Sequence, residues 1–121
     1  MKKILVIDDE AIVRLSCERT LIPEGYNVRS VARGSEGLKL LEQESFPVIL
    51  LDLKMPDMDG IEVLSKIKEI QPKSKVIMIT GYSTVETAVK ALKLGAANYI
   101  EKPFSPAALL EAVNEVIKSA E

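Results

Sequence analysis

The sequence contains no histidine, no tryptophan and a single cysteine, Cys17. One cysteine cannot form an intrachain disulfide, and without histidine it cannot complete the nitrogen and sulfur ligands of a zinc site. Aromatic residues make up only 4% of the chain, so the core must be built from Ile, Leu, Val and Ala. These shortages exclude both a disulfide framework and zinc chemistry.

The chain also lacks a large excess of positive or negative charge, and it lacks long apolar runs. Sixteen Lys and Arg against 18 Asp and Glu give a net charge of -2, without the concentrated basic face that nucleic-acid binding requires. The apolar run that begins at Ile4 meets Asp8 after four residues, which is too short for a secretory signal. No run approaches the ~20 residues of a membrane span. We therefore expect a cytoplasmic domain that binds neither nucleic acid nor membrane directly.

What the chain does contain is an alternation of two apolar periods. Continuous β-branched runs at 4–7, 48–51 and 76–79 predict strands buried on both faces, and the mixed segments 26–30 and 98–100 predict strands near the sheet edges. Between them lie apolar stripes with helical spacing. These stripes are Val13, Cys17 and Leu21; Val63, Ile67 and Ile70; Val85, Ala88, Val89 and Leu92; and Leu109, Val113, Val116 and Ala120.

Local signals support the predicted helix ends. Asp59 with Glu62 and Ser83 with Glu86 are capping-box candidates, Ser105 precedes a first-turn proline, and Gly25 and Gly95 stand where helices would end. The repeated β-α order predicts one α/β domain over residues 1–121, a doubly wound five-stranded parallel sheet with helices on both faces.

Polar side chains follow the strands of this predicted sheet. Asp8 and Asp9 follow the first strand, and Asp52, Thr80 and Lys102 follow the third, fourth and fifth. Since the C-terminal ends of parallel strands share one edge, these groups converge if those four strands are neighbours. Clustered carboxylates repel one another, and a hard cation such as Mg2+ relieves that repulsion. Asp52 could then act as the nucleophile toward a phosphoryl group, whose charge Mg2+ and Lys102 would neutralise.

Other acidic residues and the cysteine have simpler interpretations. Glu10 is expected to be a helix-start acid, because acids favour the first turn. Asp57 and Asp59, beside proline and glycine, read as turn and helix-cap residues rather than a second metal site. Cys17 lies on an apolar stripe and is expected to pack in the core.

In combination, these residues resemble the receiver domains of two-component response regulators, over essentially the whole chain. The ordered set consists of Asp8-Asp9, Asp52, Thr80-Gly81 and Lys102-Pro103, supported by Met55–Gly60, Leu94-Gly95-Ala96 and Tyr99. The resemblance implies the flavodoxin-like (βα)5 fold. It implies that Asp52 is the phosphoacceptor and that Mg2+ is held by Asp8, Asp9, Asp52 and the main-chain carbonyl of Lys54. Thr80 and Lys102 would contact the phosphoryl oxygens, and Thr80 and Tyr99 would form a switch. The resemblance also implies that the Lys102–Pro103 peptide bond is cis.

The resemblance also implies partners. A histidine kinase or phosphotransfer protein would supply the phosphoryl group, and the face made by the fourth helix, fifth strand and fifth helix would contact an effector or form a phosphorylation-dependent homodimer. Residues 81–89 are most similar to receivers of enhancer-binding transcription activators, so transcription is one expected output. Whether the chain acts alone or within a longer regulator stays open.

Two other functions share parts of this pattern. A phosphohydrolase with an aspartyl-phosphate intermediate would need a substrate pocket, for which the chain has no inserted cap. A flavin or nucleotide carrier would need a phosphate-cradling loop after the first strand, where this chain has repelling acids. The receiver interpretation implies a phosphoacceptor that catalyses its own phosphorylation and dephosphorylation, not an enzyme that turns over an external substrate.

Overall fold

Five parallel strands form one sheet in the order β2-β1-β3-β4-β5. The computed structural model describes residues 2–81 and 84–120. The elements are β1 (Lys3–Ile7), α1 (Ala11–Leu21), the short 3-10 helix η1 (Ile22–Glu24), β2 (Asn27–Val31), α2 (Gly34–Leu41), β3 (Val48–Asp52), α3 (Gly60–Ile70), β4 (Lys75–Thr80), α4 (Val85–Lys93), β5 (Asn98–Glu101) and α5 (Pro106–Ala120). The predicted doubly wound α/β sheet is confirmed.

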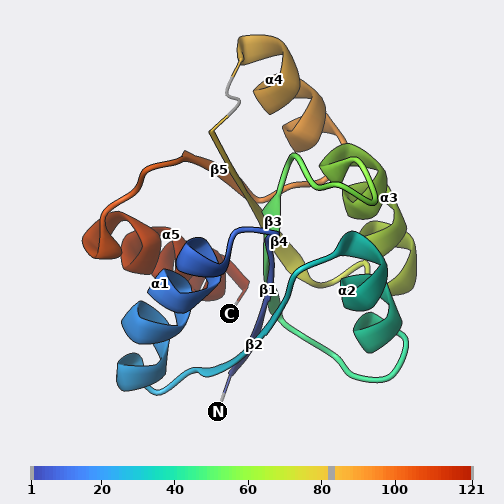
Figure 1. The fold of residues 1–121 in the computed structure, drawn as a ribbon. Helices are drawn as coiled ribbons and strands as arrows, with labels where there is room; N and C mark the ends of the chain where they lie inside the picture. The colour runs from blue at the N-terminus through green and yellow to red at the C-terminus, as the bar shows by residue number, and fades with distance from the viewer. Residues whose placement is uncertain (1, 82–83, 121) are drawn as a thin grey trace.

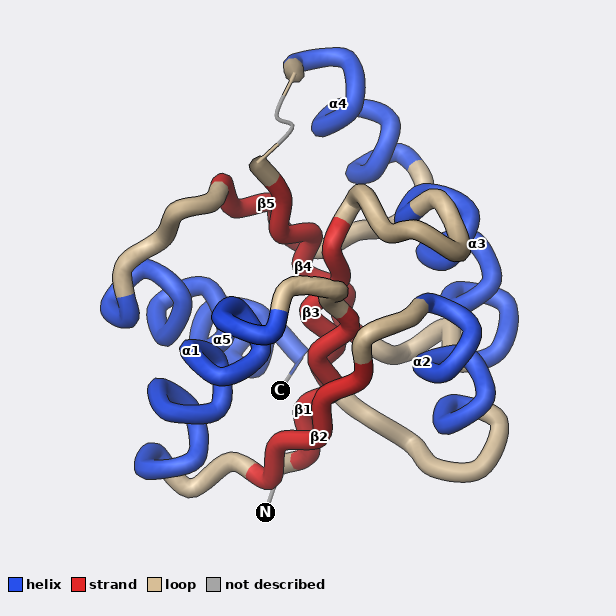
Figure 2. The backbone as a smooth tube through the Cα atoms, in the orientation of Figure 1, coloured by secondary structure: helices blue, strands red, loops and turns tan. Residues whose placement is uncertain are grey.

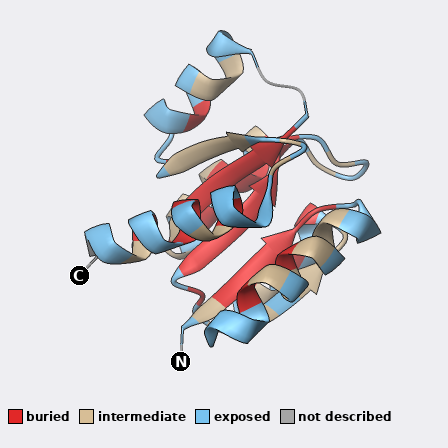
Figure 3. Ribbon diagram, turned by 90° about the vertical axis from the view of Figure 1, so that its left-hand side faces the viewer, coloured by how far each residue is buried: buried red, intermediate tan, exposed pale blue. Residues whose placement is uncertain are grey.

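Burial follows the apolar pattern of the strands. Every residue of β3 is buried, and β4 is buried from Val76 onward. The edge strands β2 and β5 are only partly covered, as their mixed polarity predicted. Figure 3 shows the buried sheet between helices whose outer faces are exposed. The three continuous apolar runs therefore occupy the centre of the sheet because both of their faces are covered.

The helices form two layers, one on each face of the sheet (Figures 1 and 2). One apolar cluster joins the sheet to α1 and α5 through residues such as Cys17, Leu109 and Val113. The other joins the sheet to α2, α3 and α4, with Phe46 and Ile67 among its buried members. Cys17 is fully buried, and burial raises the pKa of its thiol to about 12, so it is a core residue as expected.

Most predicted helix ends are confirmed. The Asp59 carboxylate accepts a hydrogen bond from the Ile61 N–H at 2.9 Å, so Asp59 is the N-cap, although within the described part of the chain the predicted capping box with Glu62 is not formed. The Ser105 hydroxyl accepts a hydrogen bond from the Ala108 N–H at 3.0 Å. Gly25 and Gly95 adopt φ values of 94° and 105°, a left-handed conformation that glycine reaches without strain. Both stand just after a helix.

The predicted start of α4 needs correction. Ser83 lies outside the described residues, and the helix begins at Val85 with Thr84 as its capping residue. The capping box that the structure describes at the start of this helix pairs Thr84 with Thr87.

The apolar stripe of α4 is also more exposed than predicted. Val85, Val89 and Leu92 are 83%, 42% and 49% exposed, whereas the buried residue of this helix is Ala91. The face that meets the sheet is centred on small side chains, and the larger apolar ones lie about one residue further round the helix. Ile70, at the end of α3, is likewise exposed. Periodicity identified which residues share a face, but not which face the sheet covers.

Helices that could cross a bilayer are absent from the described part of the chain, since none is both long and apolar enough.

Candidate functional site

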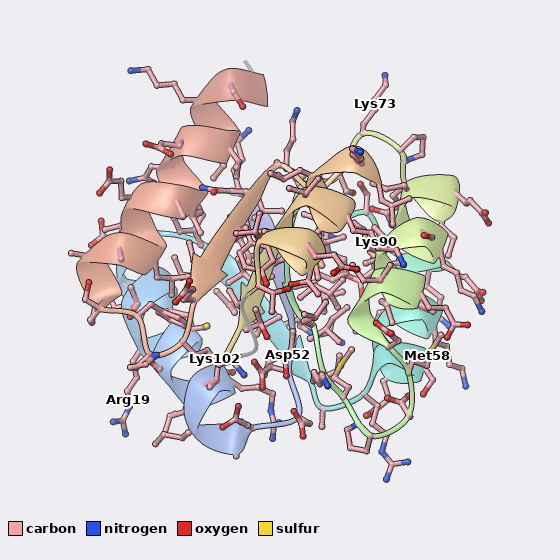
Figure 4. The ribbon with its side chains drawn as sticks, turned by 90° about the horizontal axis from the view of Figure 1, so that it is seen from above. Arg19, Asp52, Met58, Lys73, Lys90 and Lys102 are labelled. Carbon is pink, nitrogen blue, oxygen red and sulfur yellow. The ribbon has the colours of Figure 1, made fainter. Side chains whose placement is uncertain are left out.

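The polar residues predicted to converge do so at the carboxyl edge of the sheet. Asp8 directly follows β1, Asp52 ends β3, Thr80 ends β4 and Lys102 directly follows β5. Since β1, β3, β4 and β5 are successive neighbours, their C-terminal ends stand side by side. In Figure 4, which is seen from above α4 and β5, the labelled Asp52 and Lys102 lie close together, in agreement with the 3.5 Å between their charged atoms. Topology thus assembles the site from four distant segments.

The Lys102 ammonium lies among three carboxylates. Its Nζ atom is 2.6 Å from Glu10 Oε1, 2.9 Å from Asp8 Oδ2 and 3.5 Å from Asp52 Oδ2. The side chain of Lys102 is only 13% exposed, so these pairs are poorly screened by solvent. Burial alone would lower the pKa of Lys102, but its hydrogen bond to Glu10 and its ion pairs with Asp8 and Asp52 outweigh that effect and raise it. The ammonium is therefore a fixed positive charge at the end of β5.

Asp52 is a buried carboxylate that is costly to ionise. It is 3% exposed, and burial together with the nearby charge of Asp8 raises its pKa to about 7. Attraction to Lys102 and a hydrogen bond from the Lys54 N–H to Asp52 Oδ1 at 3.4 Å offset part of this cost. A cation placed beside Asp52 would favour its ionised form.

Asp8 is fully buried beside Asp52. Its Oδ1 accepts a hydrogen bond from the Glu10 N–H at 2.8 Å, which holds the carboxyl group in place. Burial raises the pKa of Asp8, although Lys102 opposes this shift. Its Oδ2 atom lies within ion-pair distance of Lys102 but has no hydrogen bond of good geometry within the described residues. That oxygen is available to a cation.

The donor set fits a divalent cation that prefers oxygen. Ligand atoms of Asp8, Glu10 and Asp52 all lie within 4.8 Å of one another. Asp9, which the sequence also predicted as a ligand, is exposed and is not a member of this close group, but it lines the same cleft. The cleft has a volume of about 810 Å³ and is also lined by Asp52, Lys54 and Lys102. Magnesium is compatible with these residues because carboxylates and few neutral ligands suit it.

The loop between β3 and α3 is held close to the sheet. A Cβ atom on Gly60 would lie 2.5 Å from the Asp52 carbonyl oxygen and 2.6 Å from Leu53 Cα, so only glycine fits there. Asp57 accepts hydrogen bonds from the N–H groups of Gly34 and Ser35, at 3.2 and 3.0 Å. It therefore caps α2, a neighbouring helix, as well as belonging to the turn that the sequence predicted. These contacts fix the segment that follows Asp52.

Comparison with known proteins assigns the family. Residues 4–114 match the response regulator receiver domain. The chain belongs to this family.

Relatives and solved structures agree with this assignment. An NtrX-like response regulator of Rickettsia bellii is 40% identical over 104 residues, which are 84% of this chain and 22% of that protein. A CheY-like receiver domain protein from Methanospirillum hungatei is 41% identical with a TM-score of 0.96, covering 99% of this chain and 96% of that one. The beryllofluoride-activated NtrC4 receiver domain dimer is 41% identical with a TM-score of 0.95 over the full length of both chains. The receiver domain thus spans about a fifth of the Rickettsia regulator that it matches.

The predicted switch residues of the receiver domain lie on neighbouring strands. Thr80 is fully buried at the end of β4, and its carbonyl accepts a hydrogen bond from the Lys102 N–H at 2.8 Å. Tyr99, on β5, is partly buried, and its hydroxyl lies 3.4 Å from Thr87 Oγ1 in the capping box of α4. The cis peptide bond between Lys102 and Pro103 is confirmed.

Sequence reasoning missed one participant in the receiver site. Glu10 was interpreted only as a helix-start acid, and it is indeed the N-cap residue of α1. Its carboxylate nevertheless makes the shortest ion pair with Lys102. The available signal was its position directly after the Asp8-Asp9 pair, which places it at the same strand end.

Proposed function

We propose that this receiver domain accepts a phosphoryl group on Asp52 from the phosphohistidine of a histidine kinase or phosphotransfer protein. An oxygen of the Asp52 carboxylate attacks the phosphorus atom, the phosphorus–nitrogen bond breaks, and the histidine nitrogen keeps the electron pair. The product is an acyl phosphate on Asp52. The observation that carries the proposal is a buried aspartate at the end of a central strand, beside a lysine and open to a cleft.

The residues around Asp52 have distinct parts in this reaction. Lys102 neutralises the negative charge of the transferred group, the main requirement of phosphoryl transfer. Thr80 offers a hydroxyl at the neighbouring strand end. Asp8, Asp9, Asp52 and the main-chain carbonyl of Lys54 would hold Mg2+, which supplies further charge neutralisation when bound. The same groups would let the domain catalyse loss of the phosphoryl group to water, without turnover of another substrate.

The output would depend on a change at the other side of β5. Movement of Thr80 toward the phosphoryl group would leave space that Tyr99 fills by turning inward. That turn would separate the Tyr99 hydroxyl from Thr87 and alter the start of α4. The exposed apolar side chains of α4 border this region, so the α4-β5-α5 face is the proposed contact for an effector or a second copy. Similarity to a probable transcriptional regulator, ycf27 of Porphyridium aerugineum, supports transcription as the controlled process, and we place the domain in the cytoplasm.

Phosphorylation of the purified chain tests the proposal. Incubation with acetyl phosphate and Mg2+ should add one phosphoryl group, measured as a mass increase of the intact protein. Asp52→Asn should abolish the increase, and a chelator should prevent it in the unaltered protein. Glu69→Gln is the matched control, because Glu69 is an exposed acid near the end of α3, on the side of the sheet where the strands begin. Full labelling of Asp52→Asn would refute the assignment.

A further inference from the structure

Glu10 has a contact that its place in helix α1 does not explain. Its backbone starts the helix, but within the described residues its side chain makes no capping hydrogen bond. Its Oε1 atom instead lies 2.6 Å from Lys102 Nζ, closer than either Asp8 or Asp52. We propose that Glu10 is a positioning residue that competes with the phosphoryl group for Lys102 and so limits phosphoryl uptake. This inference rests on the proposed function of Asp52 and Lys102.

Competition follows from the donors that Lys102 can offer. An ammonium group has three N–H donors, and its two shortest pairs are those with Glu10 and Asp8. A phosphoryl group on Asp52 brings oxygen acceptors and more negative charge to the same ammonium. The like charge of Glu10 then opposes the new group at this ammonium, which favours departure of the partner of Lys102 that is held most weakly.

Exposure decides which partner leaves. The Glu10 side chain is 53% exposed at the rim of the cleft, so it can turn into water with little loss of hydration. Asp8 is fully buried and fixed by the Glu10 N–H, and cannot turn away without losing that bond. Glu10 therefore acts as a removable partner, which holds Lys102 when no phosphoryl group is present and releases it when one arrives.

Another role for Glu10 makes the opposite prediction. Its carboxylate lies near enough to Asp8 and Asp52 to bind the same cation. If that were its function, neutralising Glu10 would weaken Mg2+ binding and phosphoryl uptake together. Competition for Lys102 instead predicts tighter binding of a phosphoryl group with Mg2+ affinity nearly unchanged. The short pair with Lys102 engages Oε1 and favours competition.

Titration with beryllofluoride, an acyl-phosphate mimic, separates these roles. The full chain, Glu10→Gln and the control Glu69→Gln would be titrated at saturating Mg2+, with the bound fraction followed by 19F NMR. We expect Glu10→Gln to lower the half-saturating concentration about threefold to fivefold, the upper part of the range for exposed ion pairs, because Glu10 is half-exposed and Lys102 is mostly covered. The control should leave that concentration unchanged. Mg2+ affinity, measured separately, should change by less than about twofold.

A second pair of variants tests whether Glu10 acts through Lys102. In a Lys102→Met background, Glu10→Gln should give no gain in beryllofluoride affinity, because the contested ammonium is gone. A gain that persists there, or unchanged or weaker binding by Glu10→Gln alone, would overturn the inference while leaving Asp52 as the acceptor. Failure of the unaltered protein to bind beryllofluoride at all would overturn the proposed function and this inference with it.

Discussion

The charge of Asp52 should destabilise the fold when Mg2+ is absent. Burial and Asp8 raise the pKa of Asp52 from 3.8 to about 7, so the folded protein favours the protonated carboxyl group. The contribution of this group to the free energy of unfolding is fully present below pH 3.8, the pKa of Asp52 in the unfolded chain, and is lost as pH rises through the folded pKa of about 7. Asp52→Asn replaces the carboxylate with a neutral group of the same size. The variant should therefore gain stability over the unaltered protein as pH increases.

The size of the gain follows from the two pKa values. At about 1.36 kcal/mol for each pH unit between them, full ionisation costs the fold about 4 kcal/mol. The pKa of about 7 already includes the attraction of Lys102, so we expect a net gain of about 3–4 kcal/mol at pH 8 and little difference at pH 4. For a domain of this length, such a gain raises the melting temperature by roughly 6–15 °C.

Urea unfolding in a chelating buffer at pH 4.5, 6 and 8 would measure this effect. The two stability curves should converge near pH 4, separate between about pH 4 and 7 and run parallel above pH 7, and Glu69→Gln should follow the unaltered protein throughout. Addition of Mg2+ should narrow the gap at pH 8, because the cation stabilises the folded carboxylates. A stability difference that does not change with pH, or a variant that is less stable at pH 8, would show that ionisation of Asp52 does not destabilise the fold.

Three further outcomes follow from particular contacts. Asp9→Ala should weaken Mg2+ binding at least about tenfold in a calorimetric titration, and unchanged affinity would remove Asp9 from the ligand set. Asp57→Ala should cost about 1 kcal/mol in chemical unfolding and increase amide exchange at the start of α2, because that helix loses its cap. Gly60→Ala should destabilise the fold by about 1–3 kcal/mol, since its methyl group would meet the main chain of Asp52 and Leu53; a neutral result would mean that the loop can yield.

The sheet and the convergence of its polar strand ends could be predicted from the sequence. The runs 4–7, 48–51 and 76–79 are buried on both faces, and that burial leaves a continuous apolar pattern that no surface strand shows. Once the strands are parallel, the positions of Asp52 and Lys102 follow from topology. The helix α2 was not located by residue number, because two of its three buried residues, Gly34 and Gly37, have no apolar side chain.

The contacts between side chains of different elements could not be predicted in the same way. The pair of Glu10 with Lys102 joins residues 92 positions apart, and its formation depends on side-chain reach rather than on any local pattern. The partial exposure of α4 depends on how the helix is rotated about its axis. The cap that Asp57 gives to α2 likewise depends on where a loop lies in space. Local periodicity contains none of this information.

The cap on α2 also affects where anions can gather on this edge of the sheet. A helix N-terminus attracts negative groups through its free N–H donors and its dipole. In α2 these donors are taken by Asp57, and the hydrogen bonds from Ser35 and Gly34 lower the pKa of that carboxyl group although slight burial works against them. The carboxylate thus stays charged and keeps dissolved phosphate and other anions away from α2. An anion drawn to this edge of the sheet would instead meet the ammonium of Lys102, which lies beside Asp52.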